Sequence, residues 1–506
     1  MELTDLFGLI APRFTARYLL NRRLLSDVRS YDAARPSQFR PTMTNLTSGD
    51  GVMDATGSRL REISRQLDEN HDLVVAILDD LVNNTIGAGV QAVPMVRTRS
   101  GELATATNDR LSELFQQWGE SPETTGDFGW EACQRQVMLS KLRDGEIFLQ
   151  HVDSNAGKAF RFKTPVPYAV ELIEADLVPF TYQDQPRNIL HGIENNAWNA
   201  PVAFWMFKNH PGDPLITGAS QFGDLKRVPA DLIIHLKYVR RLRQRRGVTV
   251  LHSVLNRMRD LKDYEESERI AARVAADFTW YIKRTSEYQG ASFDAALSAN
   301  RTMEMSGGMG FTLQPGEDVG TINATRPNTA LEAFRNAMLR AVAGGTGTRF
   351  SSISRNYNGT YSAQRQELVE GAISYRAHFA DLTRRFYRPV YQRWLAAALL
   401  VKNVRADRDI DPDTLGRVDF RAPALPWIDP TKEADAYRTL VEAGLESRQE
   451  IMRQRGRDPG KVWEEIEEER DSGLFASDVA AATDGGVIEF GSPPADEGAG
   501  DEQVAA

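Results

Sequence analysis

Two stretches of helical periodicity, separated by a long polar loop, constrain the fold of this chain more than any other feature. The first helix is expected over residues 328–343, with Asn328 as its N-cap. Gly344 and Gly345 should end it. The polar segment 346–361 that follows is longer than an ordinary connection between two helices. Because loops between stiff elements often carry function, this segment is the first functional candidate.

The second helix is expected over residues 361–400, where apolar residues repeat at spacings of three and four. These residues are Tyr375, Phe379, Leu382, Phe386, Val390 and Trp394. Pro389 lies inside the pattern. Since proline has no backbone N–H, it should kink or break the helix.

A third long helix is expected over residues 249–284. Apolar residues mark its two ends, but its middle, KDYEESER at 262–269, is almost entirely charged. A helix of this length spans about 50 Å. A helix with such a solvent-exposed middle typically crosses between two regions or packs beside copies of itself.

The remaining segments indicate a mixed α and β fold. Further helices are expected over 58–83, 108–119, 129–143 and 431–470. Short β-type runs, divided by Pro, Gly and Asn, fill residues 145–236. Residues 30–60 are polar and should form a loop or an extended arm. From Asp471 onward the chain has no Lys or Arg and should be disordered.

The composition restricts the possible functions of the chain more than it restricts the possible folds. The 506-residue chain carries a net charge of −9, which argues against tight nucleic-acid binding, because phosphate neutralisation supplies most of that affinity. A conduit for sliding DNA stays compatible, since few ion pairs would have to break at each step. The single Cys133 excludes an internal disulfide and fits a reducing compartment. No apolar run approaches the roughly 18 residues that a membrane span needs.

Two glycine-rich strings resemble nucleotide-binding motifs only superficially. Gly87, Gly89 and Ala92 match the spacing of a dinucleotide fingerprint, but they follow a helix and are interpreted as its end and a turn. Residues 344–347 lack the Lys-Ser/Thr of a P-loop. We therefore expect no bound nucleotide cofactor.

Residues with catalytic or metal-binding chemistry are isolated along the sequence. The seven histidines show no metal-ligand spacing, and Cys133 lies in a helical pattern that favours a buried structural thiol. Acidic pairs such as Asp79–Asp80 are interpreted as solvated surface. We therefore expect no catalytic and no metal site.

Two polar segments remain as functional candidates. The loop contributes Arg349, Ser351, Ser352, Ser354, Arg355, Asn356, Tyr357 and Asn358. A basic run before the third long helix contributes Arg240, Arg241, Arg243, Arg245 and Arg246. This run either forms a solvated or carboxylate-paired junction, or it faces phosphates or another subunit.

Short motifs in a fixed order carry a family resemblance over most of the chain. They include YDAA at 31–34, LVNNTIGAGV at 81–90, DFG at 127–129, GEIF at 145–148, HGIE at 191–194 and AFWMFKNHPGD at 203–213. VPA at 228–230, RRG at 245–247, LQPGED at 313–318 and TYSAQR at 360–365 follow. In this order the chain resembles the lambda-type portal protein family of tailed bacteriophages. Thr360, Ala363 and residues 345–348 depart from the family pattern, which leaves the conformation of the loop open.

The resemblance implies an α+β portal fold, with an α/β wing, long stem helices, a small β-containing clip and an α-helical crown, assembled as a ring. The implied regions are an N-terminal arm (1–60), the wing (61–247, β-rich at 145–236), the first stem helix (248–284), the clip (285–327), the second stem helix (328–345), the tunnel loop (346–361), a long kinked helix of the upper wing (362–402), the crown (403–470) and a disordered acidic tail (471–506).

The resemblance also implies a function without catalysis. Portal proteins form dodecameric rings at one capsid vertex, and the ring is the channel for DNA packaging, retention and ejection. The implied partners are other copies of the chain, double-stranded DNA contacted without sequence specificity, the large terminase subunit, a head–tail adaptor, and the major capsid and scaffold proteins. No membrane and no cofactor is implied. The chain would occupy the host cytoplasm during assembly and the portal vertex of the virion afterwards.

The missing P-loop fits this function, because a separate terminase would hydrolyse the ATP. Two alternatives come from other classes. One is a different virion structural or connector protein, and the other is a soluble hydrolase-type enzyme.

Overall fold

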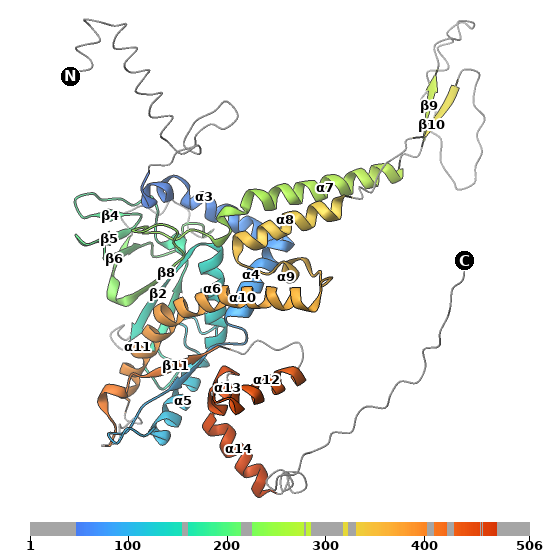
Figure 1. Ribbon diagram of the computed structural model, residues 1–506. Helices are drawn as coiled ribbons and strands as arrows, with labels where there is room; N and C mark the ends of the chain where they lie inside the picture. Colours follow the sequence, from blue (N-terminus) through green and yellow to red (C-terminus); the bar gives the residue numbers. More distant parts are fainter. Residues whose placement is uncertain are drawn as a thin grey trace, which may run out of the picture.

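The computed structural model describes residues 47–153, 160–213, 225–277, 280–284, 317–321, 330–401, 409–422, 430–455, 457 and 459–472. This part of the chain combines helices with antiparallel sheets, as expected for an α+β protein. A body of helices and strands carries a projecting pair of helices, α7 and α8 (Figure 1). Among the described helices, none is long and apolar enough to cross a membrane.

The chain enters the body through two consecutive helices, α3 (Gly49–Asn70) and α4 (Asp72–Thr85). They confirm the helical pattern at 58–83, but α3 begins at Gly49, so the expectation of an extended arm up to residue 60 is wrong. Ser48 explains the early start, because its side chain caps the helix by accepting from the N–H of Gly51 at 3.1 Å. The expected arm at 1–46 lies outside the described residues.

Helices α5 (Thr105–Gly119) and α6 (Trp130–Arg143) lie where two amphipathic patterns are expected. Their inner faces supply an aromatic core to which the C-terminal part of the long second helix contributes. The Phe115 ring, for example, lies edge-on to the ring of Trp394, with centroids 4.9 Å apart. This core joins segments that are far apart in the sequence.

Two antiparallel sheets occupy the region of short β-type runs. The first has the order β3-β2-β8, formed by β2 (Glu146–Asp153), β3 (Tyr168–Ile173) and β8 (Ile233–Lys237). The second has the order β4-β5-β6-β7, formed by β4 (Ile189–Leu190), β5 (Ile193–Asn195), β6 (Pro201–Met206) and β7 (Lys226–Pro229). Two 3-10 turns, η3 (Ala175–Leu177) and η5 (Ala230–Leu232), lie in the same region. Phe148 and Phe204 pack together in a small core between the sheets.

A two-stranded sheet brings distant parts of the chain together. Strand β1 (Gln91–Pro94) pairs antiparallel with β11 (Val418–Arg421). Gly87 and Gly89 lie between α4 and β1 with φ of 60° and 126°. The dinucleotide-like string is therefore a helix end and a turn, as expected.

The expected helix at 249–284 is shorter than the sequence predicts. A 3-10 turn, η6 (Val250–Ser253), precedes α7 (Leu255–Asp277), and residues 280–284 form strand β9 (Trp280–Arg284). Strand β9 pairs antiparallel with β10 (Glu317–Thr321), beyond the far end of α7 (Figure 1). The sequence WYI at 280–282 favours a strand, and pairing with β10 satisfies its backbone groups. Most of the expected clip, 285–316 and 322–327, lies outside the described residues.

Helix α8 (Leu331–Thr346) packs along α7. The charged middle of α7 is partly neutralised there, because Glu265 pairs with Arg335 at 2.6 Å. The sequence predicts that Gly344 and Gly345 end α8, but the helix continues through both residues. It ends at Gly347, which adopts the left-handed conformation with φ of 77°. A Cβ at position 345 would lie 2.7 Å from the Val254 side chain, so this glycine serves close packing. Asn328, the expected N-cap, lies outside the described residues.

The long second helix is divided by one wide turn. Helix α10 (Tyr361–Leu382) leads into a π-helical turn, η8 (Thr383–Tyr387), and then into α11 (Arg388–Leu399). Pro389 is the second residue of α11 and has no N–H for the bond to the preceding turn. The wide turn directly before Pro389 accommodates its ring. The chain therefore stays helical but changes direction between α10 and α11 (Figure 1).

Three helices follow near the end of the described chain: α12 (Pro430–Glu442), α13 (Arg448–Gln454) and α14 (Pro459–Asp471). They match the helical segment expected at 431–470. A 3-10 turn, η9 (Pro412–Thr414), precedes β11. Arg421 on β11 donates to the carbonyl of Arg457 at 3.0 Å, which ties these helices to the body. Residues 473–506 lie outside the described residues.

Candidate functional site

The segment between α8 and α10 contains a short helix that sequence analysis missed. Helix α9 (Phe350–Ser354) lies between Gly347 and Arg355, and both of these residues adopt left-handed φ values, 77° and 53°. The buried side chain of Ile353 packs α9 into the main core, and α9 contacts α4 and α8. The first half of the expected loop is therefore a fixed structural unit.

A network of polar side chains fastens this unit to the body. We call Asp80, Asn84, Arg349 and Tyr375 the anchor. The Tyr375 hydroxyl donates to Asp80 Oδ2 at 2.6 Å, and Arg349 donates to Asp80 Oδ1 at 3.2 Å. Asn84 donates to the same Oδ1 at 2.9 Å. Charge-assisted hydrogen bonds of this kind are stronger than neutral ones, so the anchor holds α9 on both α4 and α10.

Burial controls the chemistry of the anchor. Asp80 is only 8% exposed, so the interpretation of Asp79–Asp80 as a solvated pair is wrong for Asp80. The signal was present in the sequence, because Asp80 lies three residues from Ile77 on the apolar face of the helix. Burial raises the pKa of Tyr375, and the hydrogen bond to Asp80 raises it further. Tyr375 therefore stays protonated and acts as a hydrogen-bond donor.

The second half of the expected loop is exposed. We call residues 355–360 the tip. Arg355, Tyr357 and Asn358 are exposed, and the backbone is shaped locally: Asn358 donates its N–H to Asn356 Oδ1 at 2.9 Å. Gln364 of α10 donates to the carbonyl of Tyr357. The tip thus presents guanidinium, amide and hydroxyl groups from an ordered turn.

The three serines of the expected loop belong to α9. The backbone N–H of Ser351 donates to Oε1 of Glu367 on α10 at 2.9 Å. Ser354 donates to the carbonyl of Phe350 at 2.8 Å and accepts from the N–H of Asn356 at 3.2 Å. Together with Arg355, Tyr357 and acidic residues of α4, Ser351 and Ser352 line an open hollow of about 630 Å³. The predicted loop residues are therefore neighbours, but only those of the tip are freely presented.

The basic run before α7 divides into two parts. Arg246 is fully buried, pairs with Glu146 at 2.7 Å and lies over the Phe180 ring at 4.0 Å. Arg245 pairs with Asp50 at 3.5 Å. For these two arginines the carboxylate-paired junction is the correct interpretation.

Glu146 is the centre of that junction. It accepts from Arg246 and Arg61, both at 2.7 Å, and its Oε2 lies 2.9 Å from Nε2 of His235. Burial alone would raise the pKa of Glu146, but Arg246, His235 and Arg61 hold it well below its usual range. Burial also lowers the pKa of His235 to about 4. The junction is therefore an ionised carboxylate between two guanidinium groups, with a neutral histidine beside it.

The other three arginines, Arg240, Arg241 and Arg243, are exposed. Arg240 donates to the Tyr238 hydroxyl and Arg241 to the carbonyl of Thr47, at 3.2 and 2.6 Å. Within the described ranges, none of the three guanidinium groups is paired with a carboxylate. They remain available to a partner.

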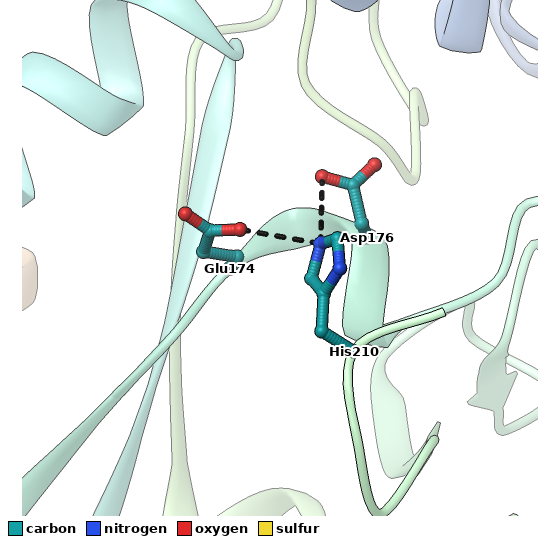
Figure 2. A group of neighbouring side chains, drawn as sticks. All are labelled: Glu174, Asp176 and His210. Carbon is teal, nitrogen blue, oxygen red and sulfur yellow. Dashed lines mark ion pairs between the residues drawn. The ribbon is translucent and has the colours of Figure 1, made fainter. Parts of the chain in front are cut away.

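Figure 2 shows that His210 lies beside the carboxylates of Glu174 and Asp176, which come from an earlier part of the chain. His210 Nε2 lies 3.3 Å from Glu174 Oε2 and 3.9 Å from Asp176 Oδ2. The Nδ1 atom accepts from the N–H of Gly212 at 3.0 Å, which places the ring proton on Nε2. The three side chains form an ion-paired group in which His210 Nε2 makes no hydrogen bond to a described residue.

The single cysteine is buried, as expected. Cys133 is 2% exposed on α6, and burial raises the pKa of its thiol to about 12. It therefore stays a thiol at neutral pH and is an inert part of the core.

Comparison with known proteins connects these features to a family. Residues 35–378 match the sequence model of the phage portal protein, lambda family. The chain belongs to this family. The matched range includes the arginine run, the anchor and the tip. The family is structural and is not a known family of enzymes.

Curated relatives of this portal protein come from several phages. The probable portal protein of Halomonas phage phiHAP-1 is 24% identical over 455 residues, which cover 87% of this chain and 86% of that protein. Portal protein B of Escherichia phage lambda is 24% identical over 271 residues, which cover 47% of this chain and 51% of that protein.

Solved structures of gene transfer agent particles are also similar. A chain from the neck of the native particle, computed with C12 symmetry, has a TM-score of 0.46 at 13% identity, covering 81% of this chain and 99% of that chain. A chain from the neck of the empty particle, computed with C6 symmetry, has a TM-score of 0.47 at 14% identity, covering 82% and 100%.

Proposed function

We propose that this portal protein forms a dodecameric ring at one capsid vertex, and that the ring is the channel for DNA packaging, retention and ejection. Residues 61–247 would form the wing, α7 and α8 the two stem helices, and β9 and β10 part of the clip. Helices α12 to α14 would form the crown. Pairing of α7 with α8 through Glu265 and Arg335 supports the stem, because it stiffens a projecting element.

The observation that carries this proposal is the contrast between the anchor and the tip. The anchor fixes α9 to α4 and α10, while residues 355–360 stay exposed. A loop that must touch moving DNA needs a firm base and a polar end. We assign residues 346–361 as the tunnel loop, with the tip facing the channel.

The chemistry of the tip suits contact with phosphates. Arg355, Asn356 and Asn358 offer N–H donors that can bind phosphate oxygens of any sequence. A net charge of −9 limits the total attraction, so each contact can break as the DNA slides. The expected DNA contacts are therefore weak and independent of sequence.

The remaining partners follow from this role. The large terminase subunit would dock on the clip and hydrolyse ATP, since residues 344–347 form a helix end and lack a P-loop sequence. A head–tail adaptor would replace it, and major capsid and scaffold proteins would surround the ring. The ring would assemble in the host cytoplasm and remain in the virion.

A packaging experiment tests the function. Heads assembled with and without this protein are treated with nuclease, and the protected DNA is quantified. We expect protected DNA only in heads that contain the protein. Equal protection in both preparations would overturn the proposal.

A further inference from the structure

The outer face of α10, formed by Val369, Ile373, Arg376 and Ala377, exposes apolar side chains to solvent. Val369 and Ile373 lie one turn apart and are 52% and 66% exposed. The opposite face of the helix carries Tyr375, which is buried against the body. A helix with apolar side chains on two opposite faces is typically covered on both sides. The outer face therefore lacks its cover in the single subunit.

The charge along this helix is mainly positive. The exposed charged residues between 361 and 387 are Arg365, Glu370, Arg376 and Arg384. The guanidinium group of Arg376, on the outer face, is not paired with a carboxylate in the part of the chain that the structure describes. A partner that fits this face should therefore combine apolar side chains with carboxylates.

The open hollow beside the tip has these properties. The residues of α4 that line it lie on one face of that helix and are Asp72, Val75, Ala76, Asp79, Asp80, Asn83 and Asn84. Asp79 is exposed, and its carboxylate is unpaired among the described residues. Asp80 is matched by Arg349, so Asp72, Asp79 and Arg355 remain as the charges of the hollow. Helix α4 itself contains no Lys or Arg. The hollow is therefore acidic overall, with an apolar floor.

The hollow and the outer face lie on opposite sides of the same stretch of α10. Gln364 and Leu368 line the hollow, on the side where α10 contacts α4 (Figure 1). At about 100° per residue, Ile373 points half a turn away from Gln364. The outer face of a subunit thus points away from the hollow of that subunit and cannot fill it. In a row of copies each outer face can meet the next hollow, and such a head-to-tail contact closes into a ring when the rotation permits.

We propose that the outer face of α10 in one subunit packs into the hollow of the next subunit. Ile373 would lie against Val75 on the apolar floor. Arg376 would pair with Asp79 at its edge. Tyr357 of the tip also lines the hollow, so the incoming helix would support the tip of its neighbour. This inference rests on the proposed ring and names the contact that joins its subunits.

Charge reversal in two separate variants tests the contact. D79K places a like charge opposite Arg376, and R376E places a like charge opposite Asp79. Each variant alone should therefore give about tenfold fewer rings than the unaltered protein. An equal mixture of the two variants should restore the rings, because every contact in a ring that alternates them joins opposite charges again. Native mass spectrometry measures the ring yield, and denaturing mass spectrometry of the isolated rings should find equal amounts of the two variants.

Two controls separate this contact from the fold and from the portal function. Both substitutions are at exposed positions, so denaturation of the isolated subunits should give the midpoint of the unaltered subunit. Ile373→Glu should also lower the ring yield, whereas Leu103→Glu, at an exposed apolar residue before α5, should not.

Normal rings of D79K and of R376E would overturn the contact and leave the portal function intact. A mixture that assembles no better than its two components would overturn it as well. Failure of the unaltered protein to form rings would contradict the portal function itself, and the contact with it.

Discussion

The hydroxyl of Tyr375 on α10 donates to the carboxylate of Asp80 on α4 at a distance of 2.6 Å. The other oxygen of this carboxylate accepts from Arg349, at the start of α9. One buried side chain thus holds both the start of α9 and the helix α10 that follows the tip. The position of the tip depends on this contact.

Removal of the carboxylate should destabilise the fold. In Asp80→Ala, Tyr375 and Arg349 lose their common acceptor, and we expect a loss of about 2–3 kcal/mol in the free energy of unfolding. Chemical denaturation measures it. The neighbouring Asp79 is exposed, so Asp79→Ala is the matched control and should not change the midpoint. Equal effects of the two substitutions would show that the anchor is not a stabilising contact.

The tip can be altered without touching the anchor. In the triple variant R355A/N356A/N358A, ring assembly should be unchanged, because these side chains lie outside the core. Packaging or retention of DNA should be impaired, as measured by the length of nuclease-protected DNA. If the altered rings hold full-length DNA normally, residues 355–360 are not the DNA-contacting tip.

Substitutions in the arginine run should affect the stability of the fold differently at buried and at exposed positions. Arg246→Met leaves Glu146 buried with one of its two guanidinium partners missing, and should cost about 3–5 kcal/mol. Arg243→Met, at an exposed position, should leave stability unchanged. Thermal unfolding of both variants provides the comparison. A similar shift in both would mean that burial of Arg246 is unimportant.

Acid should weaken the fold in two steps. Burial lowers the pKa of His235, His151 and His378 to about 4, so the unfolded chain binds more protons below pH 6.5. Stability from these groups is complete above pH 6.5 and is lost as pH falls toward 4. Glu146, whose pKa is held down in the fold, adds a loss below about pH 4.5. Unfolding measured between pH 8 and about 2 should show both declines, and His235→Gln should reduce the slope of the first; a flat profile would contradict the prediction.

Local patterns in the sequence were sufficient to locate most helices and the β-rich region. Helices α4, α5, α6, α8 and α10 follow apolar repeats that any packed helix requires. The sequence predicted that the helix of α7 extends to residue 284. Residues 280–284 instead pair as a strand with Glu317–Thr321, which lies 37 residues further along the chain. The strand preference of WYI at 280–282 was outweighed by the helical spacing of Val274, Phe278 and Ile282 in the sequence.

The candidate site was predicted in outline and not in detail. Its eight loop residues do lie together, but α9 and the anchor depend on Asp80 and Tyr375, which are 295 positions apart. Tyr375 fitted an apolar stripe, and its hydroxyl gave no sign of a partner. Gly345 was misinterpreted for the same reason, because its role depends on a residue that is distant in the sequence. It has no side chain at a point where Val254 approaches the helix closely.

A cryo-electron microscopy reconstruction of the purified full chain tests the proposed ring and the position of the tip most directly. We expect a closed ring of twelve subunits, in which residues 355–360 line the central channel and α7 and α8 form its stem. A protein that stays monomeric when co-produced with its capsid and scaffold proteins, or a ring that carries residues 355–360 on its outer surface, would contradict it.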